Sequence, residues 1–126
     1  MTGVQTCALP IYKTIPANGV WKYGFDPKKM HYFNKIPLDS RPIFDITRTN
    51  TVYIMGCHIV GGREAWQNNL RLNYNSLKSM IRCGLVDDDQ TILLMNYRED
   101  PDNIELHPID AEKNGWYVAM RNFNEA

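Results

Sequence analysis

The chain has 126 residues, 44% of them hydrophobic, and its 14 Lys and Arg balance its 14 Asp and Glu. This length suits one domain or the greater part of one, with enough apolar residues for a core. The even charge balance lacks the basic surface typical of proteins that bind nucleic acids or anionic membranes. No stretch approaches the roughly 20 apolar residues of a membrane span, so we expect a soluble, cytoplasmic protein.

The first eleven residues, MTGVQTCALPI, match the translation of a common short-read sequencing adapter. A secretory signal would need a basic start and a longer apolar run, and this segment has neither. We therefore expect residues 1–11 to be an artefact and residues 12–126 to be the C-terminal part of a longer domain. Without Cys7, only Cys57 and Cys83 remain, which predicts reduced core cysteines rather than a disulfide framework.

From residue 12 to residue 50, repeated Pro and Gly favour loops. Within this region we expect short extended pieces at 19–25 and 42–46, and one helical turn after Asp26-Pro27. Residues 51–60 are rich in β-branched and aromatic side chains and stop at Gly61-Gly62, which predicts a buried strand.

The most regular pattern in the chain predicts a helix over residues 63–83, followed by Gly84 as its stop. Five apolar side chains recur there at helical spacing and are expected to form its buried face: Trp66, Leu70, Tyr74, Leu77 and Ile81.

An acidic cluster, Asp87-Asp88-Asp89, opens a second apolar segment that predicts a buried helix. Pro101 is expected to end that helix, with short strands at 104–107 and 115–118. The order strand, helix, helix, strand predicts an α/β or α+β layer.

Three features then occur in a fixed order: the strand ending in Gly61-Gly62, the amphipathic helix with an early Trp66, and GLVDDDQ at 84–90 opening a buried helix. Together, over roughly residues 51–116, they resemble the late segment of the HtrL/YibB family of bacterial proteins. That family is in turn similar to GT-A glycosyltransferases, in which an Asp-Gln pair opens a helix beside the sugar-binding cleft. The resemblance implies a partial GT-A-like α/β sandwich, truncated at its N-terminal side.

The same resemblance implies a function, namely transfer of a sugar from a nucleotide-diphospho-sugar donor to a glycan or cell-surface acceptor. It also implies a divalent metal, manganese or magnesium, in the full-length protein. The chain lacks the Asp-x-Asp motif that holds this metal in GT-A enzymes, because Asp87-Asp88-Asp89 lies late in the chain and at a helix start, which is the wrong context. We therefore expect no metal to be bound by this part alone.

Sugar transfer passes through an oxocarbenium-like centre, which calls for carboxylates or amide oxygens near the anomeric carbon. Asp88, Asp89 and Gln90 supply both and are the candidate catalytic residues. The plainer explanation is that one Asp caps the helix while the others face solvent.

Gly61, Gly62, His58 and Trp66 are the candidate substrate-binding residues, and His107 is the candidate metal ligand. The glycines could bring the backbone close to substrate, or could simply form a strand-to-helix turn. The place of Trp66 on the apolar stripe favours a core role, and a lone His is usually neither ligand nor catalyst.

The transferase hypothesis requires the acidic helix start and the paired glycines to face one sugar-sized hollow. One rival function is a glycan-recognition or structural interaction module without catalysis. A metal-dependent hydrolase using the Asp cluster ranks last, because no His or Glu lies beside it at ligand spacing.

Overall fold

A computed structural model gives the structure of the chain and describes residues 3–6 and 24–109. In chain order the described elements are β1 (Gly3–Thr6), β2 (Met30–Asn34), α1 (Ile43–Ile46), β3 (Ile54–Gly61), α2 (Arg63–Arg82), α3 (Asp89–Glu99), the short 3-10 helix η2 (Pro101–Asn103) and β4 (Ile104–Pro108). Of the predicted strands, 115–118 lies outside the described residues, as does nearly all of 19–25.

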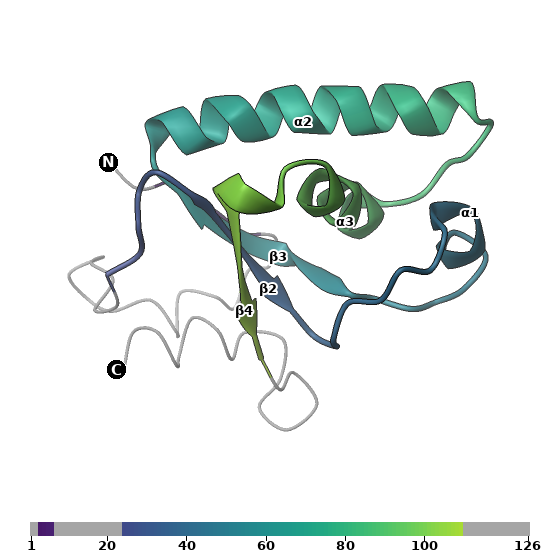
Figure 1. The fold of residues 1–126 in the computed structure, drawn as a ribbon, viewed down its shortest axis with the longest axis horizontal. Helices are drawn as coiled ribbons and strands as arrows, with labels where there is room; N and C mark the ends of the chain where they lie inside the picture. The colour runs from purple at the N-terminus through teal and green to yellow at the C-terminus, as the bar shows by residue number, and fades with distance from the viewer. Residues whose placement is uncertain (1–2, 7–23, 110–126) are drawn as a thin grey trace.

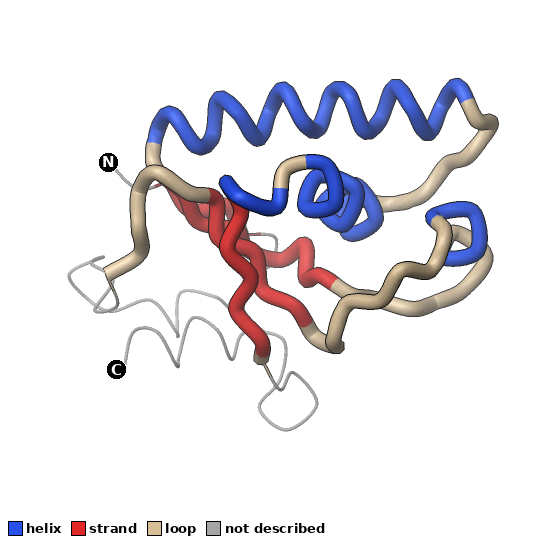
Figure 2. The backbone as a smooth tube through the Cα atoms, in the orientation of Figure 1, coloured by secondary structure: helices blue, strands red, loops and turns tan. Residues whose placement is uncertain are grey.

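The four strands form one mixed sheet in the order β1-β3-β2-β4. β3 runs antiparallel to both β1 and β2, whereas β4 runs parallel to β2. Helices α2 and α3 lie on one side of this sheet, with α2 as the outer element (Figures 1 and 2). The expectation of an α/β architecture is confirmed at this level: a small mixed domain with a four-stranded sheet and three α-helices in its described part.

The core fills the space between the sheet and these helices. Its members come from every layer and include Met30, Tyr32, Ile54, Ile59, Leu72, Leu93, Leu94 and Ile104. Alternation along the strands therefore turns Tyr32 toward the helices and its neighbours His31 and Phe33 toward the opposite face of the sheet. Both faces of the sheet are therefore buried at β2, and they carry different side chains.

The helix predicted at 63–83 is confirmed as α2, and Gly84 ends it with a φ of 71°. The predicted buried stripe, however, is wrong. Its members Leu70, Tyr74, Leu77 and Ile81 are between 50% and 66% exposed, and Trp66 is only partly buried. The helix instead buries Ala65, Asn69, Leu72, Ser76 and Met80.

Polar side chains on the buried face of α2 explain this reversal. The Tyr32 hydroxyl donates to Asn69, and the Ser76 hydroxyl is hydrogen-bonded to the Asn96 side-chain amide at 2.7 Å. These polar side chains can be buried because they are hydrogen-bonded. The most apolar stripe of such a helix is therefore not the face that it buries.

The second predicted helix is confirmed as α3, which ends just before Pro101, and the strand predicted at 104–107 is confirmed as β4. Three other expectations differ from the structure. Strand β2 lies where loops were expected, residues 43–46 form the short helix α1 instead of an extended piece, and Asp26-Pro27 opens a tight turn closed by a Lys29 N–H to Asp26 carbonyl bond of 3.2 Å. Cys83 is exposed, so it is not a core residue.

Candidate functional site

The acidic start of α3 divides its three aspartates between different tasks. Asp88 is the N-cap, and its carboxylate accepts a hydrogen bond from the Gln90 N–H at 3.1 Å. Asp87 accepts from the Asp88 N–H at 2.9 Å and from the Thr91 hydroxyl at 2.7 Å. Among the described residues, the Asp89 carboxylate has no hydrogen-bond donor, so it is the aspartate available to a ligand.

Asp89 lies against Gly56 of β3. A Cβ atom at Gly56 would overlap the Asp89 carboxylate, so a larger residue there would displace this side chain from its present position. Gly56 also falls where the β2–β3 ladder is irregular: only Tyr32 separates the paired residues His31 and Phe33, whereas residues 56–59 separate their partners Val60 and Met55. Such bulges often lie beside functional sites, because they redirect the backbone locally.

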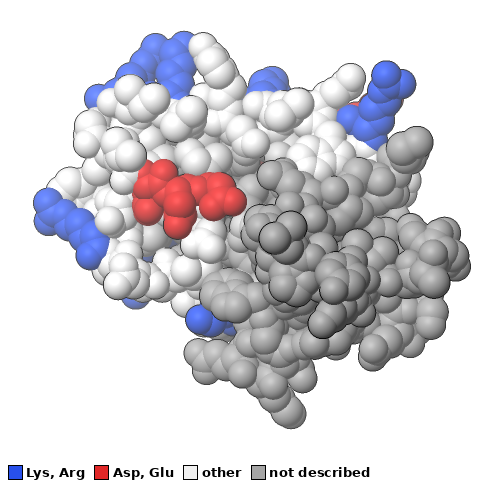
Figure 3. All heavy atoms as spheres, turned by 180° about the vertical axis from the view of Figure 1, so that it is seen from behind, with Lys and Arg blue, Asp and Glu red and all other residues white. Residues whose placement is uncertain are grey.

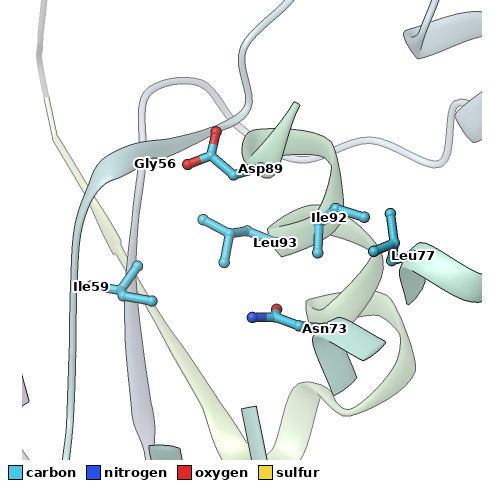
Figure 4. Close-up of a pocket in the computed structure, with 7 residues that line it drawn as sticks. All are labelled: Gly56, Ile59, Asn73, Leu77, Asp89, Ile92 and Leu93. Carbon is cyan, nitrogen blue, oxygen red and sulfur yellow. The ribbon is translucent and has the colours of Figure 1, made fainter. Parts of the chain in front are cut away.

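A pocket of about 190 Å³ opens beside this contact, where β3, α2 and α3 meet (Figure 4). Its polar groups are the Asp89 carboxylate and the Asn73 amide. Its apolar wall is made of Ile59, Leu77, Ile92 and Leu93. Figure 3 shows acidic side chains gathered in one group on the rear face of the molecule, while Lys and Arg side chains lie toward its edges.

The structure does not bring Gly61 and Gly62 to this pocket. Gly61 packs against Met30 and Ala65, and the Gly62 N–H donates to the Pro27 carbonyl at 3.1 Å. Gly61 lies five positions after Gly56, which is about 16 Å along a strand. The expectation of one hollow shared by the paired glycines and the acidic helix start is therefore not met; the glycines form a strand-to-helix turn, and Gly56 takes the place beside Asp89.

His58 and Trp66 are also not among the residues that line the pocket. His58 is fully buried beside the Phe33 ring, with centroids 4.7 Å apart, and burial lowers its pKa to about 4. It is therefore neutral at physiological pH. Trp66 packs against the edge of the core cluster, as a core residue would.

His107 lies in a second group of polar side chains, on the sheet face opposite α2 and α3. One ligand atom each from His31, Glu105 and His107 lies within 4.8 Å of the others. Burial lowers the pKa of His107, and the neighbouring His31 lowers it further, while Glu105 acts in the opposite direction. Among the described residues, these three have donor atoms that together could hold a metal ion. Of the candidate site residues chosen from the sequence, only His107 belongs to this group.

Sequence reasoning missed four residues of these two groups: Gly56, Asn73, His31 and Glu105. A signal existed for Gly56, because a glycine inside a strand pattern suggests a bulge or a close backbone approach. No signal existed for His31, which lies 76 residues from His107 in the sequence.

A family model described as "Bacterial protein of unknown function (HtrL_YibB)" matches residues 11–125. The chain belongs to the HtrL_YibB family. Among curated proteins, Protein HtrL of Escherichia coli (strain K12) is 33% identical over 108 residues, which is 82% of this chain and 37% of Protein HtrL. The chain thus spans little more than a third of the length of that relative.

The HtrL_YibB family description carries no activity, and no solved structure matches the chain. In the described part of this HtrL_YibB member, none of the helices has the length and hydropathy needed to cross a bilayer. The family resemblance inferred from the glycine-rich strand, the long helix and the Asp-Gln segment is confirmed.

Proposed function

We propose that this HtrL_YibB chain is part of a glycosyltransferase that moves a sugar from a nucleotide-diphospho-sugar donor to a glycan or surface acceptor, with the pocket between Asp89 and Asn73 as its sugar site. Gly61 and Gly62 do not line this pocket, so the proposed site is not the hollow expected from the sequence, and Gly56 takes the place of the paired glycines. The observation that carries the proposal is the contact of Asp89 with Gly56. This contact places the Asp89 carboxylate in the lining of an open pocket. Among the described residues, no donor forms a hydrogen bond to this carboxylate.

The composition of the pocket supports sugar binding. Ligand sites combine an apolar wall with a few placed polar groups, and this one joins Ile59 and Leu93 to one carboxylate and one amide. Its volume of about 190 Å³ is well below that typical of drug-sized ligands, which suits a single sugar unit. A carboxylate beside the anomeric carbon stabilises an oxocarbenium-like transition state.

The polar groups at the start of α3 have different roles in this proposal. Asp89 stabilises the developing positive charge, Gln90 is half-buried next to it, and Asp88 holds the helix start in place through its cap. In this proposal the chain forms the C-terminal part of a GT-A-like sandwich, and the nucleotide site and the manganese or magnesium ion belong to the part of the family protein that the chain does not span. We also propose that residues 1–11, which include β1, derive from a sequencing adapter and are not part of the family domain.

The test is made on a full-length protein that contains this segment, with a panel of nucleotide-diphospho-sugars as donors. We expect Asp89→Asn to lower the transfer rate by about 100-fold or more, because it removes a charge that acts on the transition state. The melting temperature should stay within a few degrees, since Asp89 does not cap the helix. Asp102→Asn, at another exposed aspartate, is the matched control and should leave both quantities unchanged.

Asp88→Ala gives the contrasting stability result, a loss of about 1 kcal/mol from the missing cap. If Asp89→Asn unfolds the protein while the folded fraction keeps full activity, Asp89 is structural and the proposal fails. If the wild-type protein binds sugars at this pocket but transfers none, the glycan-recognition function replaces the transferase.

A further inference from the structure

Two neighbouring strands place three metal-binding side chains together on the sheet face opposite the pocket. β2 and β4 are parallel, with His31 opposite Glu105 and Phe33 opposite His107. Because alternate residues share a face, His31, Glu105 and His107 all project to the same side. We propose that these three residues bind a first-row transition metal ion of the zinc or cobalt type, which joins β4 to β2.

The hydrogen bonding of His31 fixes which of its nitrogens is a ligand. Its Nε2 lies 2.7 Å from the Asp26 carbonyl oxygen, which can only accept, so Nε2 carries the proton in the neutral ring. The lone pair is then on Nδ1, which lies 2.9 Å from His107 Nε2 and 3.7 Å from Glu105 Oε2. A backbone carbonyl that orients a histidine from its far side is the usual arrangement around metal-binding imidazoles.

The spacing of the two rings is that of a hydrogen bond in the metal-free protein, with His107 Nε2–H donating to His31 Nδ1. A tetrahedral ion about 2.0–2.1 Å from each nitrogen needs them roughly 3.3 Å apart. The rings would therefore open by about 0.4 Å from their separation of 2.9 Å. Coordination also requires the other tautomer of His107, with its proton on Nδ1.

The donor set selects the type of ion. Two imidazoles and one carboxylate suit zinc, cobalt and related ions, whereas magnesium and calcium prefer oxygen ligands. His31 is buried, but the Glu105 side chain is 44% exposed, which gives the ion a route from solvent. This site therefore differs in place and chemistry from the metal proposed for sugar transfer, and it stands independently of that function.

Cobalt is the most informative probe, because its visible absorption reports the ligand geometry. The tag-free 126-residue chain, freed of metal with a chelator, is titrated with Co²⁺ and then with Zn²⁺. We expect absorption bands that saturate at one Co²⁺ per chain, displacement by Zn²⁺, and a higher melting temperature with either ion.

Glu105→Gln is the deciding variant, because this side chain is 44% exposed and we expect the change to leave the fold intact. It should weaken Co²⁺ binding by at least about ten-fold, while Glu99→Gln, an exposed glutamate on α3, should not change it. His107→Ala should abolish the bands, with circular dichroism used to score only folded protein. No saturable binding up to millimolar Co²⁺ would show that the two histidines form only a hydrogen bond. Equal binding by wild type and Glu105→Gln would show that Glu105 is not a ligand, and either result would overturn the proposed site.

Discussion

His58 shows at the scale of one residue how burial sets a protonation state. Its pKa is lowered to about 4 by burial, below the unperturbed value near 6.5. Between these values the unfolded chain binds more protons than the folded one, so stability present above pH 6.5 is lost as the pH falls toward 4. We expect the free energy of unfolding to fall by about 2 kcal/mol between pH 7 and pH 5 from this group alone.

Urea unfolding at several pH values measures this effect, with His58→Asn as the comparison. The variant has no titrating group at this position, so its stability should depend less on pH over that window. An unchanged pH dependence would mean that His58 is protonated in the folded protein and that its surroundings accommodate the charge.

The same residue scale shows what the sequence could foresee at the candidate site. The capping role of one aspartate follows from its place before an apolar segment, and Asp88 fills it. The contact of Asp89 with Gly56 depends on an irregularity in the β2–β3 ladder. The meeting of His31 with His107 depends on parallel pairing of strands far apart in the chain. Neither arrangement is encoded in local spacing.

At the scale of an element, α2 has an apolar face that is exposed and a partly polar face that is buried. We therefore expect Leu70→Ser to change the free energy of unfolding by less than about 0.5 kcal/mol, as surface substitutions usually do. Leu72→Ala, two residues away and 1% exposed, should lose about 2–5 kcal/mol. Chemical denaturation of the two variants measures both changes. A larger loss of stability in Leu70→Ser than in Leu72→Ala would show that the stripe through Leu70 is the buried face after all.

The elements that could be predicted are those with a strong local pattern: α2, α3, β3 and β4. β2 could not, because its five residues, Met30–Asn34, follow a proline-containing turn and show no alternation of apolar and polar side chains. All five are buried, which reflects a central position between β3 and β4. Only tertiary pairing makes such a segment a strand.

At the scale of the whole molecule, the sheet separates two candidate sites. The pocket beside Asp89 lies on the face covered by α2 and α3 (Figures 1 and 4), and the His31–Glu105–His107 group lies on the other. A change that removes metal binding should therefore leave sugar binding intact. The two proposals can be tested one at a time on the same chain.

The most direct test of the sugar site is a nuclear magnetic resonance titration of the ¹⁵N-labelled 126-residue chain with nucleotide-diphospho-sugars and their free sugars. We expect concentration-dependent shifts of the backbone amides of Gly56, Asn73 and Asp89, and the loss of these shifts in Asp89→Asn. Shifts confined to the Gly61-Gly62 turn, or no shifts at saturating sugar, would contradict the proposed sugar site.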